Sequence, residues 1–141
     1  MLRIYIAVGY RPNGTYKILV YPAAKTPGHR DVGVKRRKPV HWTVSNTTET
    51  ALKVRVQNFR RPDGTSAQPI DWQNQEASVP AANNAGVPGR SMLKGTVKDN
   101  ADALTYDYEV RVGTTVVTDP KLRVDNGDIL PKPKKKTLRK K

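Results

Sequence analysis

The chain of 141 residues contains no cysteine and only two histidines. Without thiolates it cannot form a disulfide, a zinc–thiolate centre, an iron–sulfur cluster or a cysteine nucleophile. His29 lies in a stretch rich in glycine and proline, and His41 lies in an alternating stretch. A metal site built on two histidines needs added carboxylates from elsewhere in the chain. We therefore expect no metal ion and no cofactor.

Long apolar runs are also missing. No run reaches the roughly 18 apolar residues of a membrane-spanning helix. The N-terminal stretch MLRIYIAVGYRPNGT has no long apolar segment and no small-residue cleavage site, so it does not resemble a signal peptide. A chain without cysteine suits a reducing compartment. Together these features predict a cytoplasmic protein.

Acidic residues are scarce relative to basic ones. The chain contains 26 Lys and Arg residues and only 12 Asp and Glu residues, which gives a net charge of +14. Seven of the cations lie in the last eleven residues, 131–141, which contain no acid. A basic chain attracts polyanions through a long-range field that salt weakens. The charge therefore indicates a nucleic acid, an anionic membrane or an acidic protein as the partner.

Aromatic residues make up 6% of the chain and hydrophobic residues 36%, so the core is modest. Eleven prolines and ten glycines predict many turns, as in an all-β fold of short strands. Between Ala103 and Val124, four apolar residues occupy every second position: Tyr106, Tyr108, Val110 and Val112. This period is typical of a strand with one face toward a core and the other toward water.

Similar alternation and turn signals predict further strands along the chain. Arg11-Pro-Asn-Gly14 and Arg61-Pro-Asp-Gly64 are strong turn sequences, and we expect the first to close a hairpin. No stretch repeats convincingly with the helical period. The predicted strands are 2–8, 16–21, 34–38, 40–44, 52–59, 70–72, 76–80, 91–97, 104–112, 115–118 and 121–124, of which the shortest are the weakest.

Two of these strands carry more specific expectations. Val34 to Lys38 is predicted as an edge strand, since its charged residues discourage aggregation and Pro39 cannot donate to a central ladder. In Leu52 to Phe59, strict alternation places Asn58 on the face of Val54 and Val56, and Phe59 on the opposite face. Residues 22–33 are predicted to form a loop.

The strands VHWTVSN and LTYDYEVRV, with the closing DPKLRV, resemble those of the cupredoxin-like β-sandwiches. The resemblance covers roughly Tyr16 to Val124, and together with the strand pattern it implies an all-β, two-sheet antiparallel sandwich of about seven to nine mostly antiparallel strands. An immunoglobulin-like sandwich is the near neighbour, because Asp102 stands four residues before Tyr106 in a manner similar to the tyrosine corner of that fold.

The resemblance also implies where copper ligands would stand. The positions of the first histidine and the cysteine correspond to Leu52 and Val110, and residues 111–119 contain no His, Cys or Met. A blue-copper site needs a thiolate and two imidazoles. The resemblance therefore implies the scaffold without electron-transfer chemistry.

Catalysis is not expected. The chain lacks a G-x-S-x-G elbow and both glycine-rich nucleotide-binding patterns. Asp71 with Glu76, or Asp99 with Asp102, are candidate carboxylate pairs, but turn formation explains most of them. We predict that the protein is not an enzyme.

Two basic segments are the candidate binding residues. We divide the chain into a sandwich domain, 1–130, and a disordered tail rich in lysine and proline, 131–141, because clustered cations repel one another. The tail has no aromatic residue for stacking on bases, so phosphate contact is expected. The candidate polyanion-binding residues are Lys35, Arg36, Arg37, Lys38, Lys132, Lys134, Lys135, Lys136, Arg139, Lys140 and Lys141.

The sequence thus predicts a non-enzymatic module that binds a polyanion, with nucleic acid as the leading partner. The alternative is a structural or assembly subunit, a homo- or hetero-oligomer, that associates through sheet edges and loops such as 81–89. A third hypothesis is a degenerate cupredoxin that still binds a small ligand or metal.

Overall fold

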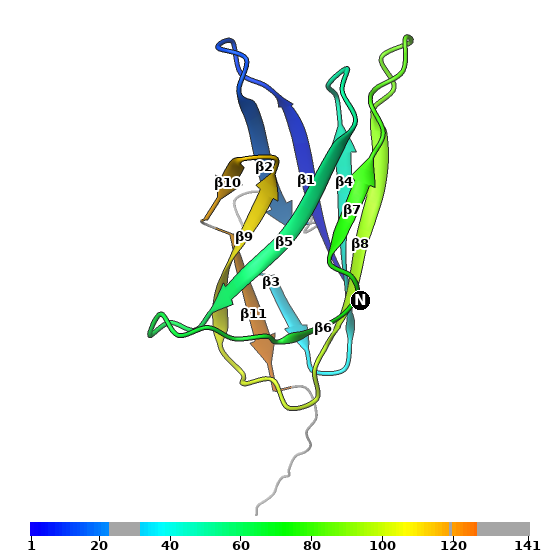
Figure 1. Cartoon of the computed structure of the whole chain (residues 1–141). Helices are drawn as coiled ribbons and strands as arrows, with labels where there is room; N and C mark the ends of the chain where they lie inside the picture. Colours follow the sequence, from blue (N-terminus) through cyan, green and yellow to red (C-terminus); the bar gives the residue numbers. More distant parts are fainter. Residues whose placement is uncertain (23–31, 119, 127–141) are drawn as a thin grey trace, which may run out of the picture.

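The computed structural model describes residues 1–22, 32–118 and 120–126 as eleven strands without a helix (Figure 1). The predicted tail, His29 and most of the predicted 22–33 loop therefore lie outside the described residues. The strands are β1 (Leu2–Tyr10), β2 (Tyr16–Pro22), β3 (Val32–Lys35), β4 (Pro39–Asn46), β5 (Leu52–Arg60), β6 (Ile70–Asn74), β7 (Glu76–Val79), β8 (Gly89–Val97), β9 (Thr105–Val112), β10 (Thr115–Val117) and β11 (Lys121–Asp125).

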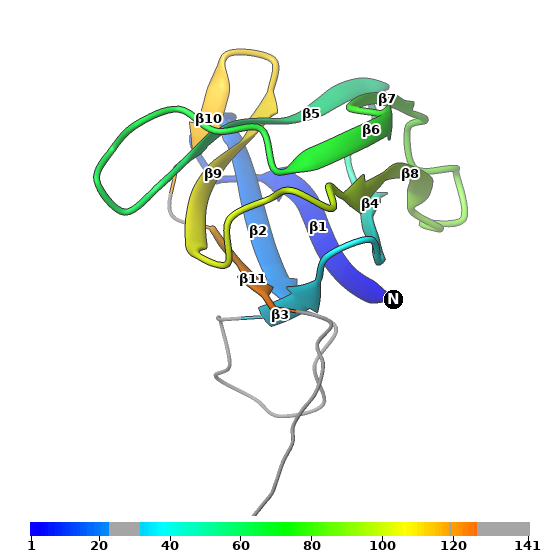
Figure 2. The same cartoon turned by 90° about the horizontal axis from the view of Figure 1, so that it is seen from below.

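The strands form two sheets. The first sheet has the order β2-β1-β4-β8-β6, and the second has the order β3-β11-β9-β5-β7, with β10 added to β9. The view from below shows β3 and β7, the two ends of the second sheet, on opposite sides of the molecule (Figure 2). At its β7 end the second sheet approaches β8 of the first (Figure 1). The all-β, two-sheet prediction is confirmed.

Most strand pairings are antiparallel, as predicted, but two are parallel, and the eleven strands exceed the seven to nine expected. β1 pairs with β4 in parallel, and β3 pairs with β11 in parallel. After the β1–β2 hairpin the chain passes through β3 in the second sheet before it returns to the first as β4. A parallel pair needs such a crossover, because a short turn can join only antiparallel neighbours.

The predicted turns and hairpin are confirmed. Arg11 and Thr15 are joined by a backbone hydrogen bond across the β1–β2 turn, and the same arrangement joins Arg61 and Thr65. In both turns the glycine, Gly14 or Gly64, has a positive φ of 85° or 88°. Only glycine adopts this conformation without a steric penalty, which explains why both sequences signal turns.

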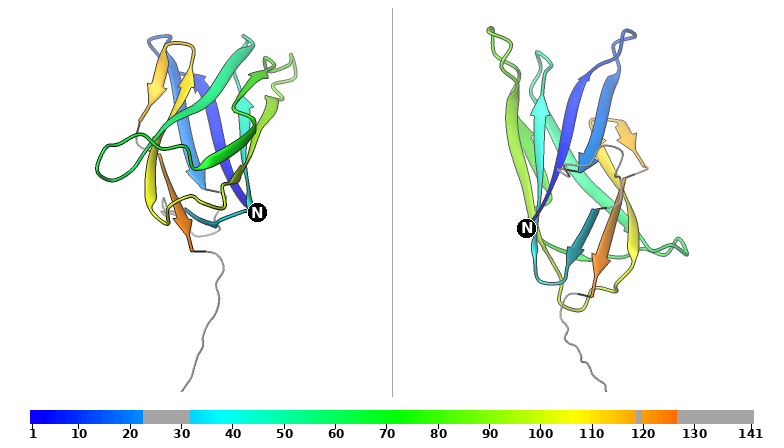
Figure 3. Two further views of the ribbon diagram at one scale, coloured as in Figure 1. Left: turned by 60° about the horizontal axis from the view of Figure 1, so that its bottom comes forward. Right: turned by 180° about the vertical axis from the view of Figure 1, so that it is seen from behind.

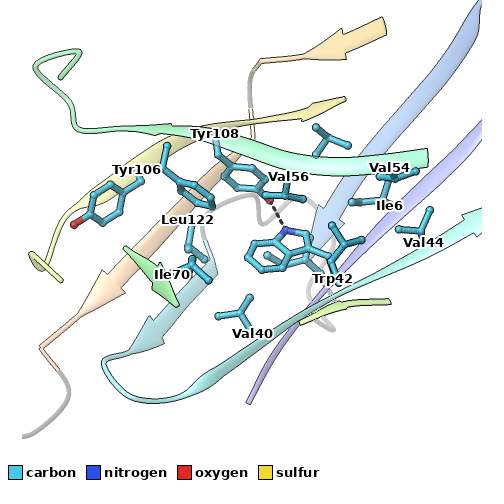
Figure 4. Packing of buried hydrophobic residues seen from close by; sticks show 14 of the residues in the cluster. Ile6, Val40, Trp42, Val44, Val54, Val56, Ile70, Tyr106, Tyr108 and Leu122 are labelled. Carbon is cyan, nitrogen blue, oxygen red and sulfur yellow. Dashed lines mark hydrogen bonds between the residues drawn. The ribbon is translucent and has the colours of Figure 1, made fainter. Parts of the chain in front are cut away.

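Alternating apolar residues fill the space between the sheets. In β4, Val40, Trp42 and Val44 are completely buried, and the residues between them are half-buried. The indole Nε1–H of Trp42 donates a hydrogen bond of 3.3 Å to the hydroxyl oxygen of Tyr108 on β9, which joins the two sheets (Figure 4). Burial of such side chains stabilises each by roughly 2 kcal/mol and is the main force that holds the sheets together.

Two strand predictions need correction. Phe59 is buried at 4% exposure and Asn58 is exposed, the reverse of the alternating prediction. The register of β5 against β9 shifts between Gln57 and Arg60, and Asn58 has a φ of 55°. This bulge inserts an extra residue, so the alternation changes phase.

The edge strand predicted over 34–38 is β3, which ends at Lys35, and Arg36 and Arg37 form a turn after it.

Candidate nucleic-acid interface

The predicted basic segment 35–38 forms the connection between β3 and β4. The Nε–H of Arg36 donates a hydrogen bond of 2.6 Å to the carbonyl oxygen of Ala101, so this half-buried side chain anchors the turn. Arg37 has a φ of 67°, and its backbone N–H donates to the carbonyl of Val97. Lys35, Arg37 and Lys38 are exposed and remain available to a partner. One of the four predicted cations is thus partly structural.

A depression of about 450 Å³ lies beside this turn. Its charged lining consists of Arg37 and Lys98 together with Asp71 and Asp99, so it carries no net charge. It therefore offers a phosphate no particular attraction. The other two candidate carboxylates lie in ion pairs, Glu76 with Arg55 and Asp102 with Arg61. In each predicted pair of carboxylates, one member therefore lies in an ion pair with an arginine.

The outward side of the first sheet carries cations from three strands. Alternation turns Arg3 outward on β1, Lys17 outward on β2, and Arg90 and Lys94 outward on β8. Strand pairing aligns Arg3 with His41 and His41 with Lys94, so these three form one row across β1, β4 and β8. Seen from behind, the same strands lie side by side (Figure 3, right). We call this surface the outer face of the first sheet.

No acid on these strands opposes the cations. β1, β2, β4 and β8 contain no Asp or Glu, and Asp71 on β6 is the one acid in the five strands of the first sheet. In the described ranges, the outward cations of this face take part in no ion pair. The ion pairs found there are Arg55–Glu76, Arg60–Glu109, Arg61–Asp102, Lys121–Asp107 and Arg123–Asp125. The charges of the second sheet are thus partly neutralised, while those of the first are not.

His41 responds to this concentration of charge. Partial burial lowers the pKa of its imidazole below the usual 6.5, and the nearby Lys94, Arg3 and N-terminal ammonium lower it further. A cation disfavours a second positive charge nearby. Burial and the neighbouring cations therefore both disfavour the charged imidazolium of His41.

Tyrosines stand beside these cations. Tyr5 and Tyr21 are paired across β1 and β2, with ring centroids 5.9 Å apart and planes inclined by 31°. Tyr21 is 47% exposed and Leu19 on the same strand is 49% exposed. A second pair, Tyr10 and Tyr16, stacks at 5.6 Å at the turn end of the hairpin, on the side of the inward residues.

Sequence reasoning missed the outer face because its cations are separated by up to about ninety residues. Three of the predicted strands, 2–8, 16–21 and 91–97, contain a cation at an outward position and no acid, but no pattern in the sequence indicates that 91–97 joins the sheet of the other two. The clustered lysines and arginines of 35–38 and 131–141 drew attention instead. The seven predicted tail cations lie outside the described residues.

The two positions at which the cupredoxin resemblance would place copper ligands lie in the core. Leu52 is 6% exposed and Val110 is completely buried, and both belong to the apolar cluster between the sheets. His41 lies on the opposite side of its strand from that cluster. In the residues that the structure describes, no three His, Cys, Asp or Glu side chains come together in a way that could hold a metal ion.

Comparisons with known proteins assign no family. No protein-family model matches the chain, and no curated protein sequence matches it. The fold therefore defines the class: an all-β protein of two mixed sheets. Among its described residues, no helix is long and apolar enough to cross a membrane.

Proposed function

We propose that this protein is a non-enzymatic binding module on a cupredoxin-like scaffold and that its partner is a nucleic acid. The observation that carries the proposal is the segregation of charge between the sheets. Arg3, Lys17, Arg90 and Lys94 share the outer face of β1, β2, β4 and β8, four strands without an acid, whereas five cations elsewhere have acidic partners. Unpaired cations on one face attract a polyanion, because binding releases its condensed counterions.

The cupredoxin-like assignment rests on the placement of the two motif strands. VHWTVSN forms the centre of the first sheet as β4, and TYDYEVRV forms the centre of the second as β9. A feature shared with the immunoglobulin-like neighbour is the bond of 2.8 Å that the Tyr106 hydroxyl donates to the carbonyl of Asp102. On either scaffold, aliphatic side chains stand where copper ligands would be required.

The exposed cations of 35–38 and the tail 131–141 extend the proposed contact. Lys35, Arg37 and Lys38 lie at the end of the molecule where β3 meets β4, beside the start of the outer face at Pro39. Seven more cations follow in the tail. Contacts of these residues with phosphates give affinity without sequence recognition.

The test is the affinity of the full chain for RNA and DNA as a function of salt. Between about 50 and 200 mM salt, the affinity should fall steeply and linearly on a logarithmic plot. Replacing Arg3 and Lys94 by glutamine should lower the slope by about one for each phosphate that is no longer neutralised. The matched control replaces Lys121 and Arg123 by glutamine. These two cations already have acidic partners, so their loss should change the salt slope less than the loss of Arg3 and Lys94.

Removal of residues 131–141 should lower the slope further, since the shortened chain neutralises fewer phosphates and so releases fewer counterions. An affinity that does not change with salt, or an equal effect of the paired and unpaired cation variants, would overturn the proposal.

An assembly function is the second candidate, and the edge strand β2 favours it. β2 is the last strand of the first sheet, has seven residues and exposes Leu19 and Tyr21. A long edge with exposed apolar side chains can pair with a strand of another chain. Light scattering at high concentration tests this candidate: a monomer counts against it, and a dimer that Leu19→Lys dissociates supports it.

A further inference from the structure

The proposed nucleic-acid partner has a specific form. We infer that it is single-stranded and that its bases stack on Tyr5 and Tyr21 at the outer face of the first sheet. This inference rests on the proposed function and adds the part of the nucleic acid that is recognised. It depends on three features of the face: the tyrosine pair, the cations on both sides of it, and the small side chains beside it.

The tyrosine pair is fixed by strand register. Tyr5 on β1 stands opposite Tyr21 on β2, and pairing continues from Tyr5 to Thr43 and from Thr43 to Met92. Strand pairing fixes the positions of the two Cα atoms, and the rings lie against each other with centroids 5.9 Å apart. An aromatic ring fixed in this way stacks on a base with little loss of entropy, and every base has a face that can stack.

Cations flank this aromatic row on two sides. The neighbouring row on one side contains Arg3, His41 and Lys94; on the other side Arg90 lies one row away and Lys17 two rows away. Successive outward residues of a strand are about 7 Å apart, a distance that the long side chains of arginine and lysine can span. Bases on the tyrosines would thus have positive charge on both sides for the sugar–phosphate backbone.

Side chains of small volume separate the tyrosines from β8. On β1 the outward residues that follow Tyr5 are Ala7 and Gly9, and on β4 those that follow His41 are Thr43 and Ser45. The outward residues of the flanking strands β2 and β8 are larger: Lys17, Leu19, Tyr21, Arg90 and Met92. Small residues on the two middle strands allow a flat base to approach the sheet closely. A duplex hides the faces of its bases within its own stack, so it could use the cations but not the tyrosines.

The experiment compares two tyrosine pairs in the full chain. The probes are single-stranded and duplex oligonucleotides of about 12 nucleotides, a length within the usual site size, and inorganic polyphosphate. Tyr5→Leu with Tyr21→Leu should weaken single-strand binding by about tenfold or more, since one stacked base contributes about 1–3 kcal/mol. Polyphosphate binding and the salt slope should stay unchanged, because the charges remain.

Two controls keep the test specific. Tyr5→Phe with Tyr21→Phe keeps the rings and should bind like the wild type. Tyr10→Leu with Tyr16→Leu removes the stacked pair on the other side of the same hairpin and should also bind normally. Thermal unfolding of each variant identifies any loss of binding that results from misfolding. If the double leucine variant misfolds, Tyr21→Leu alone, at the 47% exposed position, takes its place.

The possible results separate this inference from the proposed function. If the Tyr5 and Tyr21 leucine variant binds single strands like the wild type, or if duplex binds as tightly as single strands, the stacking inference is wrong while the charge-based proposal stands. If no nucleic acid binds with salt-dependent affinity, both fail. Tighter binding to vesicles of anionic phosphatidylserine than to single strands would identify a lipid surface as the partner and would overturn both.

Discussion

Trp42 and Tyr108 meet at the centre of the molecule, where the indole N–H of one strand donates to the hydroxyl of the other at 3.3 Å. Trp42 belongs to the first sheet and Tyr108 to the second, and their rings lie edge to face with centroids 6.0 Å apart. Phe59 stacks on Tyr108 at 5.0 Å. This cluster joins the sheets by a directional bond as well as by apolar contact (Figure 4).

Replacement of Tyr108 by phenylalanine should destabilise the fold by about 1 kcal/mol. The change keeps the ring packing but removes an acceptor from the completely buried Trp42 indole, and an unsatisfied buried donor costs roughly 1–3 kcal/mol. Urea unfolding monitored by tryptophan fluorescence measures the difference. Tyr5→Phe on the outer face is the control and should be neutral; equal stabilities of the Tyr108 variant and the wild type would contradict the prediction.

Asn46 should be the most sensitive polar position. It is completely buried, and its amide donates to the carbonyls of Thr50 and Pro80, each at 2.9 Å. Its Oδ1 accepts from the backbone N–H and the hydroxyl of Thr48. Asn46→Leu leaves these groups without their partner, so we expect a loss of about 3 kcal/mol. Asn100→Leu at an exposed position is the control; a cost below about 1 kcal/mol at Asn46 would argue against the network's importance.

Arg37→Gly should stabilise the fold by about 0.5 kcal/mol. Arg37 has a φ of 67°, a conformation that costs a residue with a Cβ atom about 1–2 kcal/mol. Glycine removes this cost, but its greater entropy in the unfolded chain cancels part of the gain in stability. Lys38→Gly, next in the chain and without a positive φ, should destabilise. Thermal unfolding of the two variants should therefore show shifts of opposite sign; shifts of the same sign would refute the strain.

His41 should make stability rise with pH around its titration. Its folded-state pKa is lowered, so the unfolded chain binds more protons in the window just below pH 6.5. The stabilisation is present above the unfolded pKa of about 6.5 and is lost as the pH falls through the folded pKa. NMR titration of the imidazole measures the pKa directly. Lys94→Gln should raise it, and an unchanged value would contradict the assigned cause.

Nucleic-acid binding should shift the same titration in the opposite direction. Phosphates placed near His41 favour the charged imidazolium and raise its pKa. By linkage, affinity at constant salt should then increase as the pH falls from about 7 toward 6. His41→Gln should remove this pH dependence while it retains most of the affinity at pH 7. If the pH dependence persists in that variant, His41 does not lie at the interface.

Local patterns in the sequence determined the strands and their turns. The alternation of Val40, Trp42 and Val44 and the turn glycines Gly14 and Gly64 depend on side-chain period and on backbone sterics within a few residues. Those forces act on a stretch by itself, so the all-β, two-sheet class could be predicted. The basic runs were visible for the same reason, because their members are neighbours in the chain.

Only the tertiary structure decided the pairing between distant strands and everything that depends on it. Phe59 points into the core because β5 shifts its register against β9, and Arg3 meets Lys94 because β4 lies between β1 and β8. Neither relation has a local signal, because packing of the whole chain decides which distant strands pair and in which register. The cationic outer face is therefore a property of sheet order, and its four cations become a single surface only when the sheet forms.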